Sequence, residues 1–173
     1  MSSSKSKKST EELIKQLSNH INLAVIGHVD SGKSTTCGAI LYLSNCLTDH
    51  ELNKLGEEAE KFGRGSFRLA FATDSTQEEK RRGITIDLAH KEFLTKNRHF
   101  TIVDCPGHRD FIKTAIKGVA QAESALLMIS AADGIEPQTL EHLVLTRTSN
   151  VTHLVCAINK MDMVFDRLKR KGY

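Results

Sequence analysis

A glycine-rich segment carries the clearest chemistry in this chain. Residues 27–34 read GHVDSGKS and match the phosphate-loop pattern G-x-x-x-x-G-K-[ST], between an apolar stretch at 21–26 and a helix-like stretch at 35–41. Such a turn points backbone N–H groups and the positive end of a helix dipole at one spot, which favours polyphosphate. We expect Lys33 to reach the β and γ oxygens and Ser34 to ligate Mg²⁺. The predicted phosphate-loop residues are Gly27, His28, Val29, Asp30, Ser31, Gly32, Lys33, Ser34 and Thr35.

A second segment with phosphate chemistry follows the stretch 100–103, which is typical of a strand. It consists of Asp104, Cys105, Pro106 and Gly107. A carboxylate at the end of a strand beside the phosphate loop can hold Mg²⁺ through water, and the Gly107 N–H can contact a γ-phosphate. Further upstream, the Thr85 hydroxyl can complete the magnesium shell, so that triphosphate orders the surrounding segment and hydrolysis releases it. Taken alone, Thr85 also fits an ordinary strand residue.

The base is indicated by residues 159–162, which are Asn159, Lys160, Met161 and Asp162. Guanine presents N1–H and N2–H₂ side by side, so the Asp162 carboxylate can accept from both. Adenine would leave that carboxylate unpaired, and unpaired buried polar groups cost about 1–3 kcal/mol. Asn159 is expected to brace the loop, and the Lys160 stem to lie along the base. The alternative for this motif is a solvated turn after a strand.

His108 is the candidate catalytic residue, because it directly follows the predicted γ-phosphate contact. Phosphoryl transfer to water requires a water molecule in line, and a side chain here can orient it. The alternative is a histidine at a helix N-terminus that faces solvent. His28 and His142 have no comparable neighbours and are interpreted as structural.

The elements that position these groups alternate between strand and helix. Residues 93–94 and 100–103 predict a hairpin with its turn at 96–98, and two apolar stretches at 124–130 and 152–158 predict buried parallel strands. Helical spacing runs over 111–121 and 137–148, with Pro137 suited to a first turn. The predicted fold class is therefore α/β, a three-layer P-loop nucleoside-triphosphatase fold with a mostly parallel sheet and helices on both faces.

Two segments fall outside that alternation. Residues 48–83 form a long insertion with capping boxes at Thr48/Glu51 and Thr76/Glu79, and its place beside the phosphates favours a functional lid over a linker. Residues 1–18 predict a basic, largely disordered tail and a short helix that begins near Ser9. We therefore expect the nucleotide-binding domain to occupy residues 19–173.

Composition limits the remaining possibilities. The chain has 173 residues, enough for one domain, and 39% of them are apolar. No apolar run is long enough for a membrane span or a secretory signal, so we expect no membrane partner. Four cysteines without C-x-x-C spacing favour buried, reduced thiols in a cytoplasmic protein. The net charge of +3 equals the contribution of Lys5, Lys7 and Lys8, so composition does not predict a nucleic-acid binder.

Taken together, the motifs GHVDSGKSTT, GSF, RRGITID, DCPGHRDFIK and NKMD resemble the translational GTPases, in particular the elongation factor 1-alpha type, over residues 21–162. The resemblance implies a GTPase that binds GTP or GDP with Mg²⁺ in the cytoplasm. It also implies the ribosome, aminoacyl-tRNA (mainly through further domains) and a guanine-nucleotide exchange factor as partners. Val29 and Ile84 match the apolar pair that gates His108, and Asp30 matches the acid thought to hold a monovalent cation.

The chain also departs from the family pattern. Residues 113–116 read KTAI where the family usually has Asn-Met after the lysine, and 132–138 lack an insertion common in eukaryotic members. The family continues with one more strand and helix, a loop against guanine and two β-barrels, so the resemblance implies a C-terminally incomplete domain. A release-factor or ribosome-rescue GTPase and a truncated, non-catalytic binding module remain alternatives. An ATP-using kinase does not agree with Asp162.

Overall fold

The computed structural model describes residues 19–170, and its centre is a five-stranded sheet in the order β2-β3-β1-β4-β5. Neighbouring strands run parallel except for β2, which pairs with β3 as an antiparallel hairpin. The predicted α/β class and the mostly parallel sheet are confirmed. The tail and helix predicted over 1–18 lie outside the described residues. The strands are β1 (His20–Gly27), β2 (Ala89–Leu94), β3 (His99–Asp104), β4 (Ser124–Ser130) and β5 (His153–Asn159).

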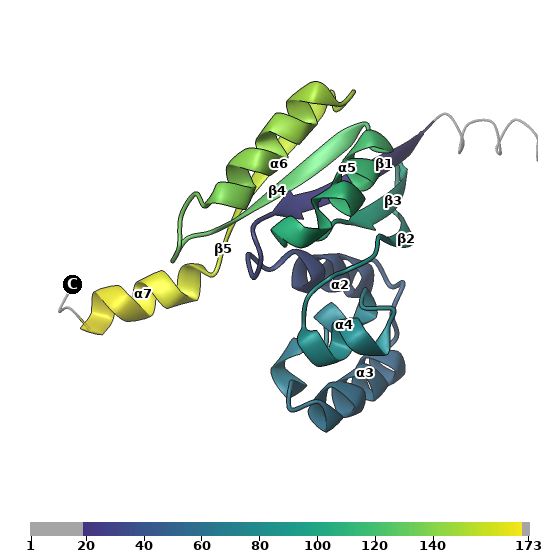
Figure 1. Cartoon of the computed structure of the whole chain (residues 1–173). Helices are drawn as coiled ribbons and strands as arrows, with labels where there is room; N and C mark the ends of the chain where they lie inside the picture. Colours follow the sequence, from purple (N-terminus) through teal and green to yellow (C-terminus); the bar gives the residue numbers. More distant parts are fainter. Residues whose placement is uncertain (1–18, 171–173) are drawn as a thin grey trace, which may run out of the picture.

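Helices cover both faces of this sheet (Figure 1). The helix α2 (Lys33–Leu43) packs Cys37 and Leu41 on one face, against Val25, Ile102 and Met128. On the other face, α5 (Ile112–Ala120) and α6 (Pro137–Thr148) pack on a separate cluster. That second cluster contains Ala24, Ile26, Val103, Ala115, Val119 and Leu127. Neighbouring residues of β1 point to opposite faces, which gives the two layers of core.

The predicted lid is a separate group of helices beside α2, away from α5 and α6 (Figure 1). It contains α3 (Asp49–Lys61), two short 3-10 turns, η1 (Gly65–Phe67) and η2 (Ala70–Ala72), and α4 (Gln77–Arg82). Both predicted capping boxes are present, Thr48 with Glu51 on α3 and Thr76 with Glu79 on α4. Each box satisfies N–H groups at a helix start and so places the start of its helix.

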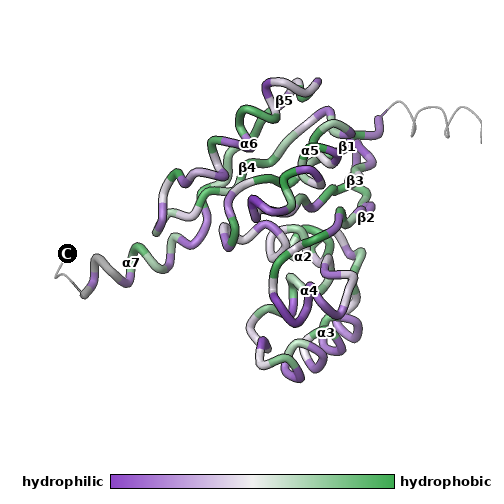
Figure 2. The backbone as a smooth tube through the Cα atoms, viewed as in Figure 1, coloured by the Kyte–Doolittle hydropathy of each residue, from purple (hydrophilic) through white to green (hydrophobic). Residues whose placement is uncertain are grey.

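One prediction about the strands is wrong. Residues 152–158 were expected to be buried, but Leu154, Val155 and Ile158 of β5 are 44%, 61% and 65% exposed. Among the described residues β5 pairs only with β4, at the edge of the sheet, and its apolar side chains are not covered by helices as those of β1 are. Figure 2 shows hydrophobic residues along the central strands, with many hydrophilic residues on α3 and α4. After β5, α7 (Met161–Arg170) leads away from the sheet.

The cysteines also differ in part from expectation. Cys37 and Cys105 are buried free thiols, as predicted, whereas Cys46 and Cys156 are exposed. Cys46 follows α2 in a surface loop, and Cys156 lies on the uncovered edge strand. Within residues 19–170 the helices are too short or too polar to cross a bilayer.

Candidate nucleotide-binding site

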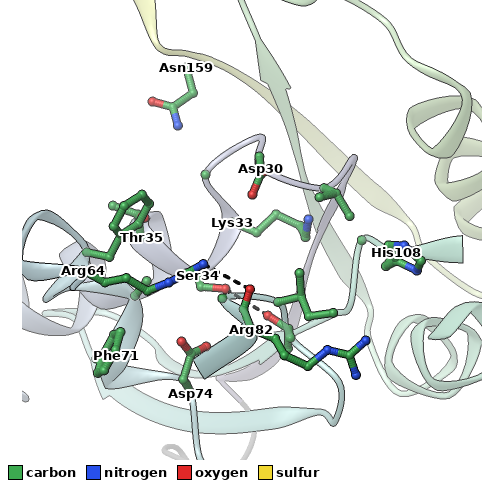
Figure 3. A pocket seen from close by; sticks show the side chains of 18 of the residues that line it. Asp30, Lys33, Ser34, Thr35, Arg64, Phe71, Asp74, Arg82, His108 and Asn159 are labelled. Atoms are coloured by element: carbon green, nitrogen blue, oxygen red, sulfur yellow. Dashed lines mark hydrogen bonds between the residues drawn. The ribbon is translucent and has the colours of Figure 1, made fainter. Parts of the chain in front are cut away.

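A cavity of about 760 Å³ lies between the phosphate loop and the lid (Figure 3). Sites for ligands of this size typically enclose about 300–1,000 Å³. Residues predicted from four separate parts of the sequence line the cavity. They are Val29, Asp30, Gly32, Lys33, Ser34, Thr35, Ile84, Thr85, Gly107, His108, Asn159 and Lys160.

The phosphate loop joins the end of β1 to the start of α2. Gly27 and Gly32 have φ of 137° and 95°, which L side chains rarely adopt, and Gly32 is the N-cap of α2. Lys33 is only 6% exposed, and its ammonium donates to the His28 carbonyl at 2.6 Å. Burial lowers the pKa of Lys33, while the nearby Asp104 carboxylate opposes that shift. The loop therefore presents a buried lysine and a helix N-terminus to the same cavity.

A magnesium ion would find suitable donors beside this lysine. The hydroxyl oxygens of Ser34 and Thr85 lie 3.1 Å apart, although the two residues are 51 positions apart in the chain. Asp104 is fully buried, and neither carboxylate oxygen has a hydrogen-bond partner within residues 19–170. Burial raises the pKa of Asp104, while the positive charge of the Lys33 ammonium opposes that shift. Two hydroxyls and an unpaired carboxylate are the hard oxygen donors that Mg²⁺ prefers.

Gly107 brings the segment after β3 against the phosphate loop. A Cβ at this position would collide with the Lys33 ammonium and approach the Gly27 carbonyl oxygen to 2.9 Å. Only glycine fits here without displacing the phosphate loop, and Gly107 lines the cavity close to Lys33. The parallel pairing of β1 with β3 places both loops at the same edge of the sheet.

His108 lines the cavity as the N-cap of η3 (Arg109–Phe111), apart from Lys33 and Asp30 (Figure 3). Its side chain is 39% exposed, and its Nδ1 accepts from the Asp110 N–H at 3.2 Å. The apolar pair Val29 and Ile84 lines the same cavity. The imidazole therefore has one nitrogen engaged with the backbone and stands beside the region where the γ-phosphate is predicted.

The predicted base-binding motif is only partly assembled around the cavity. Asn159 and Lys160 line it, and the Asn159 amide donates to the Ser31 carbonyl at 3.0 Å, which agrees with its expected bracing role. Met161 and Asp162 begin α7, are exposed, and do not line the cavity. The geometry thus brings Lys33 and Asp104 together but leaves Asp162 outside the cavity lining.

Several other predicted residues lie behind the cavity wall. Gly27, Ser31, Asp104, Cys105 and Pro106 are buried, and with His28 they do not line the cavity. The helix α6 supports this layer in two places, which the sequence analysis did not anticipate in detail. The Gly27 N–H donates to His142 Nδ1 at 2.9 Å, and His28 Nε2 lies 3.3 Å from the Glu136 carboxylate. Burial lowers the pKa of His142 to about 4, with Lys33 and His28 adding to the shift. Both histidines are therefore part of the support of the phosphate loop.

The lid contributes residues that sequence reasoning did not single out, among them Arg64, Phe71, Asp74 and Arg82. Asp74 is 8% exposed, and burial raises its pKa to about 7, with Asp104 and Glu79 adding to the rise. No pattern in the sequence pointed to Asp74, because its low exposure arises only when the lid is folded against the cavity.

Comparison with known proteins agrees with this geometry. The family model described as the elongation factor Tu GTP binding domain matches residues 18–171. The chain belongs to this family. It is 51% identical over 154 residues to elongation factor 1-alpha of Natronomonas pharaonis, covering 88% of this chain and 36% of that protein. It is 52% identical over 145 residues to elongation factor 1-alpha of Halobacterium salinarum, covering 84% of this chain and 34% of that protein. The chain thus spans about a third of the length of these relatives.

Solved structures give the same assignment. A bacterial selenocysteine-specific elongation factor, EF-Sec, matches with a TM-score of 0.59 and 32% identity over 83% of this chain and 20% of that chain. Elongation factor SelB from Methanococcus maripaludis, solved with the GTP analogue GppNHp, matches with a TM-score of 0.52 and 26% identity. That match covers 82% of this chain and 22% of the other. The predicted translational GTPase family and G-domain fold are confirmed.

Proposed function

We propose that the chain binds GTP with Mg²⁺ and hydrolyses it to GDP and phosphate, as the G domain of a translation elongation factor that delivers aminoacyl-tRNA to the ribosome. One observation carries the proposal. Lys33, Ser34 and Thr85 line one cavity, and the buried, unpaired Asp104 carboxylate lies close to Lys33, although these residues come from distant parts of the chain. This combination of donors suits a magnesium-bound polyphosphate.

The phosphate end supports the binding step. A buried ammonium and a helix N-terminus favour the negative charge of the β- and γ-phosphates. Mg²⁺, held by Ser34 and Thr85 and through water by Asp104, would supply charge neutralisation on the phosphate oxygens. In our proposal the neighbouring backbone of Val29, Gly32 and Thr35 lines the phosphates. A monovalent cation near Asp30 is part of the same proposal, because Asp30 lines the cavity beside Lys33.

Base selection is assigned to the loop after β5. Asn159 braces the phosphate loop, and Lys160 lines the cavity. Asp162 begins the adjoining helix, and we propose that its carboxylate accepts from N1–H and N2–H₂ of guanine. Asp162 is exposed and lies two residues beyond Lys160, so its carboxylate is free to approach the base edge when nucleotide enters.

The hydrolysis step is assigned to His108, with Val29 and Ile84 as the apolar gate. His108 lines the cavity next to Gly107, and its exposed ring can orient a water molecule. Positioning is the main task of the protein in phosphoryl transfer, and a stimulating partner can contribute about 10³–10⁵ in rate. The ribosome is the proposed stimulating partner, and a nucleotide exchange factor would reload the site. The proposed location is the cytoplasm.

The names of the relatives favour elongation over the release or rescue alternative, since both relatives described above are elongation factors. A non-catalytic binding module remains the second candidate function. It is favoured by the exposed apolar residues of β5, which leave one edge of the sheet uncovered. The two functions differ in turnover, so the decisive test measures both binding and hydrolysis.

The test uses the whole chain with a fluorescent GTP analogue and Mg²⁺. We expect unlabelled GTP to displace the analogue and ATP to fail, whereas Asp162→Asn should weaken GTP by at least about tenfold and favour xanthosine triphosphate, which carries a carbonyl at C2. Under single turnover, His108→Ala should keep its affinity and slow hydrolysis by about 10² or more. Equal displacement by ATP would contradict the guanine assignment. Unchanged turnover in His108→Ala, in the presence of ribosomes, would contradict the catalytic one.

A further inference from the structure

A hydrogen bond from Arg64, a residue that lines the cavity, connects two parts of the lid. Arg64 directly precedes η1, and its Nη2 donates to the carbonyl oxygen of Arg82 at the end of α4, 3.1 Å away. Figure 3 shows the Arg64 side chain pointing toward Arg82. The bond joins residues 18 positions apart. It therefore links the first half of the lid to the segment that enters the magnesium site.

Gly83, the residue after Arg82, leaves room for the Arg64 guanidinium because it has no side chain. Gly83 ends α4 with φ of 68°, and its N–H donates to the Glu79 carbonyl at 2.6 Å. A Cβ on Gly83 would overlap Arg64 Nη1, so the planar group lies directly on the Gly83 backbone. The guanidinium also lies over the Phe67 ring, whose centroid is 5.7 Å from Arg64 Cζ. The position of Arg64 is thus defined by packing against Gly83 and Phe67 as well as by the hydrogen bond.

Thr85 lies two residues after Gly83, and the chain that follows Thr85 is held by hydrogen bonds as well. One oxygen of the buried Glu79 carboxylate accepts from the N–H groups of Ile86 and Asp87, at 2.9 and 3.1 Å. Arg64 therefore holds the chain on the N-terminal side of Thr85, at Arg82 and Gly83, and Glu79 holds it on the C-terminal side, at Ile86 and Asp87. The hydroxyl of Thr85 is consequently presented to Ser34 by a short segment that is anchored at both ends.

We infer that Arg64 is a positioning residue which holds the segment 83–87 so that Thr85 meets the magnesium-bound triphosphate, and that it thereby sets the preference for GTP over GDP. This inference rests on the proposed function. A diphosphate lacks the γ-phosphate that Thr85 is expected to sense, so the position of Thr85 affects GTP binding and leaves GDP binding nearly unchanged. The free energy of ordering the segment is then part of GTP affinity alone.

The charge of Arg64 acts in the same place. Arg64 and Lys80 are the cations that oppose the raised pKa of Asp74, whose carboxylate is buried in the cavity wall. Lys80 is also paired with Glu58 of α3 at 2.9 Å. Replacing Arg64 with lysine preserves a positive charge and one donor but removes the planar fork that covers Gly83. Comparison of Arg64→Ala with Arg64→Lys therefore separates the effect of losing the positive charge and the donor from the effect of losing the planar guanidinium.

The test measures the affinities of the whole chain for GDP and for a non-hydrolysable GTP analogue in the presence of Mg²⁺. For Arg64→Ala we expect about tenfold weaker binding of the GTP analogue and less than about twofold change for GDP, because one hydrogen bond from a charged group is lost. Arg64→Lys should recover part of the loss. The matched control is Arg68→Ala, which removes an exposed arginine at the other end of η1 and should leave both affinities unchanged.

A second measurement does not depend on nucleotide. Amide hydrogen exchange of residues 83–87 should be faster in Arg64→Ala than in the wild type or in Arg68→Ala, since the segment opens locally more often. Equal loss of GTP and GDP affinity, or unchanged exchange, would overturn the inference while leaving the proposed function in place. A wild-type chain that binds neither nucleotide would overturn both.

Discussion

The phosphate end and the base end of the cavity use the same local design, a strand followed by a turn and a helix, but they differ in how they are supported. The phosphate loop follows β1, where Ala24, Val25 and Ile26 are fully buried between two layers of helices. The base loop follows β5 at the edge of the sheet, where Val155 and Ile158 are 61% and 65% exposed. A motif's residue types therefore do not set its rigidity, because the rigidity comes from what covers the strand beneath it.

The largest effect is expected from replacing one buried or exposed isoleucine in the strand at each end of the cavity. Ile26→Ala should lower the free energy of unfolding by about 2–5 kcal/mol, since it opens a cavity in a closed core. Ile158→Ala should cost less than about 1 kcal/mol, because the side chain is mostly in contact with water. Urea unfolding at pH 7 measures both. Similar losses at the two sites would show that β5 is covered in solution and would remove the contrast.

A second test uses pH to protonate His142, which supports the phosphate loop through its hydrogen bond with Gly27. His142 of α6 accepts from the Gly27 N–H, and its pKa is about 4, well below the ordinary value of 6.5. Because the folded pKa is the lower one, the contribution of neutral His142 is complete above about pH 6.5. It declines as pH falls toward 4, by on the order of 3 kcal/mol.

The measurement compares urea midpoints of wild type and His142→Asn between pH 4.5 and 7. The asparagine oxygen can still accept from Gly27 but does not titrate in this range, so the variant should lose stability less steeply toward low pH. His50→Asn, at an exposed position on α3, is the control. Asp74 titrates in the opposite sense: its pKa of about 7 makes its carboxylate destabilising as pH rises from about 4 toward 7. The difference between the two chains, and not the absolute slope, therefore reports His142, and parallel profiles would contradict its role.

The smallest effect is expected at the contact that joins the two ends. Asn159 donates to the Ser31 carbonyl at 3.0 Å, and it also packs against Gly32. Asn159→Ala removes one hydrogen bond of about 1 kcal/mol, so nucleotide affinity should fall by about fivefold. Isothermal titration with GDP measures this change. Asn97→Ala, in the exposed hairpin turn, is the matched control, and an equal loss there would argue against a specific link.

Most of the fold was accessible from sequence because its signals are local. The helix over 137–148 and the strand over 124–130 were predicted at their observed boundaries, since Pro137 and continuous apolarity define them. Both lid capping boxes were also predicted. The same local reasoning was wrong for the burial of β5, because an apolar stretch reports what a strand could bury and not whether another element covers it.

The candidate site divides in the same way. Lys33, Ser34, Asp104 and His108 could be predicted as site residues because their motifs lie in short, contiguous runs. Arg64 and Asp74 were missed as cavity residues, since their neighbours along the chain resemble an ordinary surface helix and its loop. Their place at the site depends on the lid folding against α2.

Residue type and spacing were thus sufficient to predict a phosphate loop, the acidic motif at 104–107 and a guanine-type motif, because each consists of groups only a few positions apart, whereas the Ser34–Thr85 pair joins residues 51 positions apart. Folding decided which of them share one cavity, which are braced by α6, and which remain at an open edge. The physical reason is that burial, pKa and hydrogen bonds such as the one from Arg64 to Arg82 arise between segments that no local pattern connects.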